Sequence, residues 1–316
     1  MEKKFRLLVH GGAGTILKSS MTPQLEKDYR SGLELALAAG YQILEKGGSS
    51  LLAVEASVKV LEDNPLFNAG KGAVFTHDKK HELDASIMDG KTLKAGAVAG
   101  VTNIKNPVNL AMKILRESDY VMLCGEGAEK FAAQHGVKQV ESSYYFTDFR
   151  YQQLLQIIDT DKFQLDHNVK LTKVGEDNKK FGTVGAVALD MDGNLAAATS
   201  TGGLTNKRFG RIGDSPIIGA GTYANNATCA VSCTGQGETF IRNVVAYDIS
   251  CLMEYKGLNL AEACRFVVNK LNQQDPECGG LIAIDKSGEI CFEFNTPGMY
   301  RGLILENGIS ETFIYS

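Results

Sequence analysis

The sequence predicts an α+β protein in which two stacked, mainly antiparallel sheets lie between layers of helices. Two pairs of short apolar runs flank tight turns, at residues 184–190 with 195–200 and at 279–285 with 289–295, and such adjacent hairpins build antiparallel sheets. Segments with the apolar spacing of helices lie before and between these pairs. An αββα sandwich fits this order. No internal repeat divides the 316 residues, so we expect one domain.

In the first half of the chain, a buried strand is expected at residues 5–9 and an amphipathic helix at 23–46, which a glycine pair terminates. Ser49 and Ser50 are typical caps for a second helix that ends near Asp63. Further strands are expected at 81–90 and 93–102, and helices at 107–117, 126–134 and 152–158. From residue 160 to 182 the chain turns polar and charged, which is typical of a mobile linker.

The second half opens with the hairpin at 184–190 and 195–200, which encloses a Met-Asp-Gly-Asn turn. The remaining expected elements are strands at 217–221 and 229–233, helices at 237–255 and 259–272, the hairpin at 279–285 and 289–295, and strands at 303–305 and 312–315.

The composition excludes several classes of protein. With 44% apolar and 22% charged residues and a net charge of −4, the chain resembles ordinary soluble proteins and lacks the basic blocks of nucleic-acid binders. No apolar run approaches the roughly 20 residues that span a bilayer, and the short apolar stretch at 5–9 predicts no signal peptide. Seven scattered cysteines without the spacing of a zinc site indicate a reduced, cytoplasmic protein.

Two motifs suggest ligands but are weak. The run His10-Gly-Gly-Ala-Gly follows a strand, yet no Gly-Lys-Ser/Thr completes a phosphate-binding loop, so His10 is expected to be structural. His81, Glu82 and Asp84 lie close together but lack the His-Glu-x-x-His pattern of a metal-binding helix, so we expect no transition metal there.

The junction Gly182-Thr183 separates the polar segment from a strand and predicts a self-cleavage site. A threonine hydroxyl needs a neighbouring base, and an N-terminal threonine supplies one through its own α-amine, whose reference pKa is about 7.7–8.0. Thr183 becomes N-terminal only if the chain is cut. The hydroxyl would attack the preceding peptide, form an ester, and water would release it. Such a Gly-Thr pair is also common at the start of an ordinary buried strand.

The motifs Gly182-Thr-Val-Gly-Ala-Val-Ala and Ala198-Thr-Ser-Thr-Gly-Gly resemble the isoaspartyl peptidase/L-asparaginase family of N-terminal-nucleophile hydrolases. The resemblance runs from the His10 glycine motif to the C-terminal strands. It implies a four-layer αββα sandwich, cut into an α subunit of residues 1–182, with the linker at its end, and a β subunit of residues 183–316. It also implies cleavage of β-aspartyl (isoaspartyl) dipeptides and L-asparagine to L-aspartate, and a dimer of cleaved halves, (αβ)₂.

The resemblance assigns roles around Thr183. Thr201 would orient the nucleophile, Asn68 would point toward the site, and Thr234 with Gly235 would stabilise the oxyanion. For the substrate, it implies Arg211 at the α-carboxylate, a group that a guanidinium can grip with two bonds, Asp214 at the α-ammonium, and close approach of the Gly237 backbone. Arg208 is an alternative to Arg211.

The loop at residues 64–72 resembles the family's sodium-binding loop, and no organic cofactor is expected. By this resemblance the ion is held by the main-chain carbonyls of Leu61, Glu62, Asn64, Phe67, Ala69 and Lys71. Lys71 departs from the family, which often has an apolar residue there.

Three other functions stay open. A glycosylasparaginase would act on sugar amides, but it has His-Asp where this chain has Phe181-Gly182. An uncleaved relative would bind amino acids or assemble with partners without catalysis. A nucleotide-binding protein rests on the His10 glycine run alone.

Overall fold

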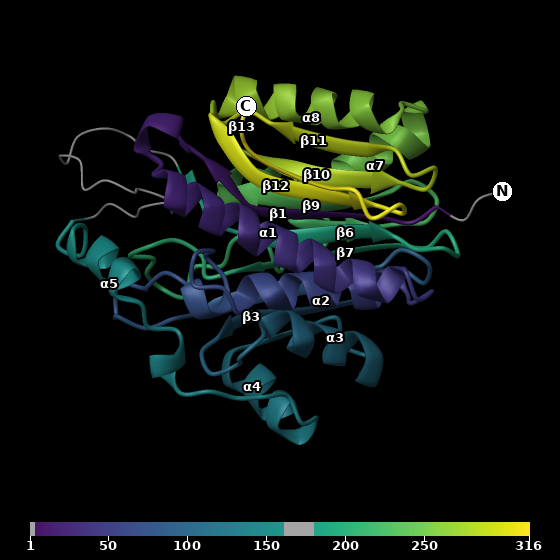
Figure 1. Cartoon of the computed structure of the whole chain (residues 1–316). Helices are drawn as coiled ribbons and strands as arrows, with labels where there is room; N and C mark the ends of the chain where they lie inside the picture. Colours follow the sequence, from purple (N-terminus) through teal and green to yellow (C-terminus); the bar gives the residue numbers. More distant parts are fainter. Residues whose placement is uncertain (1–3, 161–179) are drawn as a thin grey trace.

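The computed structural model describes residues 4–160 and 180–316, and its strands form two sheets (Figure 1). The described part contains no helix that is both long and apolar enough to cross a membrane. The larger sheet has the order β13 (Ser310–Tyr315), β12 (Gly298–Leu305), β1 (Arg6–Gly14), β6 (Val184–Leu189), β7 (Leu195–Thr201), β2 (Leu83–Asp89), β3 (Ala95–Val101) and β4 (Met122–Cys124), and β5 (Lys180–Phe181) pairs with β1. The smaller sheet has the order β11 (Ile290–Phe294), β10 (Gly279–Asp285), β9 (Cys229–Gly235) and β8 (Thr222–Ala224). In these two sheets, β3 with β4 is the one parallel pair among the described strands.

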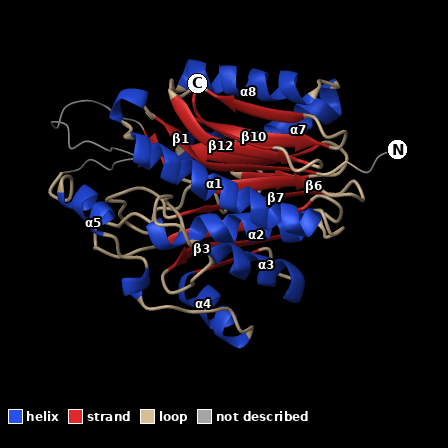
Figure 2. Ribbon diagram, viewed as in Figure 1, coloured by secondary structure: helices blue, strands red, loops and turns tan. Residues whose placement is uncertain are grey.

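Helices pack against both sheets, and Figure 2 shows the strands gathered between them. The helices are α1 (Pro23–Leu44), α2 (Ser50–Glu62), α3 (Pro107–Glu117), α4 (Gly125–Gln134), α5 (Asp148–Leu155), α6 (Gly237–Asn243), α7 (Val245–Lys256) and α8 (Leu260–Gln274). One apolar core joins α1, α2 and α3 to the larger sheet, and another joins α7 and α8 to the smaller sheet. A third core lies between the two sheets.

Strand β6 shows how the alternation of side chains builds these layers. Val184 and Ala186 belong to the core shared with α1 and α2, whereas Val187 and Leu189 belong to the core between the sheets. Successive strand residues point to opposite faces, so a strand that is apolar at every position is buried on both sides. The prediction of a mixed α and β protein with two mainly antiparallel sheets is confirmed, as are both predicted hairpins.

The predicted strand at 217–221 and the predicted unbroken helix at 237–255 are both wrong, and the two segments contact each other. Residues 217–221 form turns, and the strand comes later, at Thr222–Ala224. The predicted helix 237–255 is broken at Val244, which has a left-handed φ of 49°. The break starts a new helix, and the first amides of α7, at Ala246 and Tyr247, donate to the carbonyls of Ala220 and Gly219. These bonds satisfy helix-start amides that have no partner within α7.

Several other predictions differ in their bounds. The strand expected at 5–9 is β1, which continues through the His10 glycine motif to Gly14. The short helix expected at 152–158 is α5, which begins earlier because the Thr147 side chain accepts a bond from the Arg150 amide and caps it. The strand expected at 303–305 is the C-terminal end of the longer β12. Most of the predicted linker, residues 161–179, lies outside the described residues.

Candidate active site

Thr183 lies immediately before β6, with Gly182 between it and the short strand β5, and is 5% exposed. Its carbonyl accepts a bond from His10 Nδ1 at 3.1 Å, so His10 Nε2 is the ring acceptor for the Ser232 hydroxyl at 2.8 Å. Burial lowers the pKa of His10 to about 3, so the ring is neutral at physiological pH. His10 therefore fixes the backbone of Thr183 and has the structural role that its sequence predicts.

The carbonyl oxygen of Gly182 is held by two side-chain donors. Asn68 Nδ2 donates to it at 2.9 Å and Thr201 Oγ1 at 3.0 Å. The Thr183 hydroxyl in turn donates to Thr201 Oγ1 at 3.3 Å. Attack by the hydroxyl on this peptide would place negative charge on the Gly182 oxygen, where the two donors already point. The structure thus brings Asn68, Gly182, Thr183 and Thr201 together around one peptide bond.

Thr234, at the end of β9, is buried, and its hydroxyl has no hydrogen-bond partner among the described atoms. Gly235, the next residue, lines the same cavity as Thr183. A buried hydroxyl without a partner is costly. The Thr234 hydroxyl is therefore a spare buried donor in the residue next to the cavity wall.

Asp214 and Arg211 both line the cavity. Asp214 is 3% exposed, and one of its carboxylate oxygens has no partner among the described atoms. Burial raises its pKa to about 7, although the positive charge of Arg211 acts to lower it. Arg211 already has a partner, because its Nε and Nη2 donate to the two carboxylate oxygens of Glu238 at 2.9 Å each. Glu238 was missed in the sequence, where a glutamate in the first turn of a helix has no distinguishing signal.

Gly237 lies against this pair. A Cβ there would come within 2.7 Å of Arg211 Nη2 and 3.0 Å of the Asp214 amide, so only glycine lets the start of α6 approach so closely. Arg208, the alternative to Arg211, instead donates to the carbonyl of Thr160 at 3.4 Å.

The cavity beside Thr183 has a volume of only about 10 Å³, near the roughly 10–15 Å³ that one water molecule needs. Its lining residues are Gly182, Thr183, Thr201, Gly203, Leu204, Arg211, Gly213, Asp214, Ser215 and Gly235. The peptide before Thr183 is thus part of the wall, and the uncut chain leaves no room for a dipeptide.

The loop after α2 curls tightly and could hold a hard cation. A Cβ on Gly72 would clash with the Phe67 carbonyl oxygen, and one on Gly70, with φ of 49°, would clash with the Glu62 carbonyl oxygen. The glycines therefore let the chain fold tightly against main-chain carbonyl oxygens, which are the ligand type that hard cations prefer. In residues 4–160 and 180–316, no group of three or more His, Cys, Asp or Glu side chains is arranged as a metal site.

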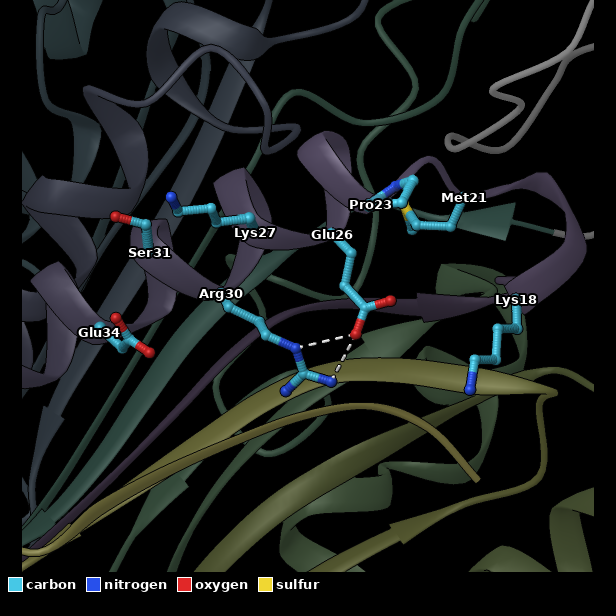
Figure 3. A pocket seen from close by; sticks show the side chains of 8 residues that line it. All are labelled: Lys18, Met21, Pro23, Glu26, Lys27, Arg30, Ser31 and Glu34. Carbon is cyan, nitrogen blue, oxygen red and sulfur yellow. Dashed lines mark hydrogen bonds and ion pairs between the residues drawn. The ribbon is translucent and has the colours of Figure 1, made fainter.

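A larger hollow of about 600 Å³ lies along α1 but holds none of the predicted site residues (Figure 3). The charges shown at its centre are already paired, because Glu26 accepts two bonds from Arg30, at 3.0 and 2.9 Å, and one from the Tyr315 hydroxyl at 2.9 Å. This hollow therefore lies apart from the predicted site at Thr183.

Comparison with known proteins agrees with this geometry. A family model described as asparaginase matches residues 3–314. The chain is 52% identical to the isoaspartyl peptidase of Escherichia coli, over 98% of this chain and 95% of that protein. It is 40% identical to the isoaspartyl peptidase/L-asparaginase of Xenopus laevis, over 93% and 90%, and 42% identical to the plant-type L-asparaginase of Pyrococcus furiosus, over 95% and 96%.

Proposed function

The chain belongs to the asparaginase family, and from this premise we propose that it is a threonine hydrolase that activates itself by cleavage. It converts β-aspartyl dipeptides and L-asparagine to L-aspartate, the activities for which its relatives are named. Its two sheets and their helices form the four-layer αββα sandwich of N-terminal-nucleophile hydrolases. Cleavage divides this single domain into residues 1–182 and 183–316.

The observation that carries the proposal is the pair of donors on the Gly182 carbonyl. The Thr183 hydroxyl attacks the Gly182 carbonyl carbon, while Asn68 Nδ2 and Thr201 Oγ1 stabilise the oxyanion. The bond between the Gly182 carbon and the Thr183 nitrogen then breaks, and that nitrogen takes the proton that the Thr183 hydroxyl lost in its attack. Water hydrolyses the resulting ester, which frees the Gly182 carboxylate and leaves Thr183 with a free amine and a free hydroxyl.

The second reaction uses the same hydroxyl on a bound substrate. The new amine takes the proton of the Thr183 hydroxyl as it attacks the side-chain amide carbonyl. The unpartnered Thr234 hydroxyl and the Gly235 amide receive the oxyanion. Asp214 holds the α-ammonium group and Arg211 the α-carboxylate, which displaces Glu238. Ammonia or an amino acid leaves, and water releases aspartate from the ester.

We assign a structural sodium ion to the loop after α2, because its glycines let the chain fold tightly against main-chain carbonyl oxygens. The carbonyls of Leu61, Glu62, Asn64, Phe67, Ala69 and Lys71 would hold it, and the ion would fix the loop that carries Asn68. The cleaved enzyme would work as a dimer of α/β halves. All seven cysteines are unpaired, which supports a reducing, cytoplasmic compartment.

The proposal is tested by following purified protein on denaturing gels and by intact mass over several days. We expect two fragments, one ending at Gly182 and one beginning at Thr183, and release of aspartate from β-Asp-Leu and from L-asparagine. Thr183→Ala should stay whole and inactive. A wild-type chain that stays whole and releases no aspartate would refute the proposal, and it would favour the uncleaved amino-acid-binding alternative.

A further inference from the structure

Arg150, on α5, is a charged side chain in the protein interior, with 1% of its surface exposed. Its guanidinium donates to the Gly72 carbonyl through Nε at 2.8 Å, to the Leu66 carbonyl through Nη2 at 3.3 Å and to Gln153 Oε1 through Nη1 at 3.1 Å. Burial lowers its pKa only to about 10, so the group stays charged at physiological pH. A buried charge is tolerated only where its hydrogen bonds are made, which binds α5 firmly to these carbonyls.

The two main-chain carbonyls that Arg150 grips lie on either side of Asn68. The chain between them forms the tight loop of residues 66–72, and the Phe67 ring anchors it edge-on to Tyr29, at 5.5 Å between ring centroids. Asn68 itself is oriented by the Val74 amide, which donates to Asn68 Oδ1 at 3.0 Å. This bond leaves Nδ2 to donate to the carbonyls of Gly182 and Gly203, at 2.9 and 2.8 Å.

We propose that Arg150 is a positioning residue for self-cleavage: by holding both ends of the 66–72 loop, it keeps the Asn68 amide against the Gly182 carbonyl. The inference rests on the proposed function, because it concerns the cleavage step. Arg150 uses the carbonyls of Leu66 and Gly72, which are not among the six that we assign to sodium. The guanidinium and the ion can therefore hold the same loop together.

Arg301 provides a control for an arginine with a purely structural role, although it is only partly buried. Its guanidinium also donates to main-chain carbonyls, those of Met299 and Tyr315, and burial also lowers its pKa to about 10. It lies on β12, where its guanidinium bonds to Met299 and Tyr315 and lies over the rings of three phenylalanines, away from the 66–72 loop. Loss of either arginine should lower the melting temperature, but only loss of Arg150 should act on cleavage.

The experiment measures the first-order rate of self-cleavage in freshly purified full-length Arg150→Met, Arg301→Met, Asn68→Ala and the Arg150→Met/Asn68→Ala double variant. We expect Arg150→Met to slow cleavage by about 10²-fold, the loss that follows from misplacing a catalytic group by about 1 Å. Arg301→Met should stay within roughly threefold of wild type. The double variant should be no slower than Asn68→Ala, because two residues that act through one contact are not additive.

Each result separates the positioning role from the alternatives. Equal slowing by Arg150→Met and Arg301→Met, or multiplied losses in the double variant, would overturn the inference. So would wild-type cleavage in Arg150→Met, while the proposed function would stand. A wild-type chain that never cuts would instead remove the proposed function and this inference with it. If Arg150→Met does not fold, Arg150→Lys keeps the charge but not the two-carbonyl grip, and it should cut more slowly than wild type.

Discussion

Replacing Thr201 by valine tests the cleavage chemistry with the smallest change of shape. The valine keeps the branched side chain but removes a hydroxyl that donates to the Gly182 carbonyl at 3.0 Å and accepts from the Thr183 hydroxyl at 3.3 Å. Loss of one oxyanion donor costs about 10²–10³-fold in rate, or about 2.7–4 kcal/mol. Because Asn68 remains as the second donor, we expect Thr201→Val to slow cleavage by that factor and not to abolish it.

The same substitution has a separate effect on stability. Thr201 Oγ1 also accepts a bond from the amide of Gly203 at 3.0 Å, and an orphaned buried amide costs about 1–3 kcal/mol. That loss is smaller than the roughly 5–15 kcal/mol that stabilises a typical domain, so the variant should fold with a lower melting temperature.

The assay is the appearance of the 183–316 fragment with time, by gel densitometry and intact mass, beside a thermal melt of each protein. Thr201→Ser is the matched control, because it keeps the hydroxyl and should cut within about tenfold of wild type. A folded Thr201→Val chain that cuts at the wild-type rate would show that Thr201 does not act on the Gly182 carbonyl, and the reasoning would fail.

Three further predictions concern other groups. Burial raises the pKa of Glu62 to about 8, so the native state keeps a proton that the unfolded state releases near pH 4.5. The free energy of unfolding should therefore fall by about 1.4 kcal/mol per pH unit between these two values. In urea melts from pH 5 to pH 8, Glu62→Gln should lose less stability than wild type, and parallel curves for the two proteins would contradict this. Glu238→Gln removes the charged competitor at Arg211 and should lower the KM for L-asparagine several-fold while sparing cleavage; a raised KM would mean that Glu238 orients the arginine. Gly72→Ala forces a Cβ against the Phe67 carbonyl and should slow cleavage. It should also reduce any difference between the melting temperatures measured in sodium chloride and in potassium chloride. If that difference stays as in wild type, the ion lies elsewhere.

The sequence predicts the parts of the fold that depend on local periodicity. Both hairpins follow from apolar runs around short turns, and the first two helices from capping residues and glycine stops. The kink at Val244 could not be predicted, because its left-handed backbone is stabilised by carbonyls some 25 residues earlier in the chain. A β-branched residue is otherwise a poor choice for that conformation.

The site divides in the same way. Around Thr183, the threonines, glycines and Asn68 carry recognisable motifs, and the structure brings them together. Glu238 and Arg150 belong to no recognisable motif, because a glutamate in the first turn of a helix and an arginine in a short helix are common in any sequence. Their importance comes from contacts across 27 and 78 residues of chain, which no local pattern reports.

The two proposed reactions need different oxyanion donors. In the uncut chain, the donors for cleavage already have a hydrogen-bond acceptor, whereas the Thr234 hydroxyl, a donor for substrate hydrolysis, has none. The donors for cleavage, Asn68 and Thr201, are already bonded to the Gly182 carbonyl. The Thr234 hydroxyl is buried without a partner, and the cavity beside it holds at most about one water molecule. Moreover, the Thr183 nitrogen is still an amide and cannot act as a base. Cleavage would therefore supply the base and remove the peptide that fills the substrate's place, so the first reaction has to precede the second.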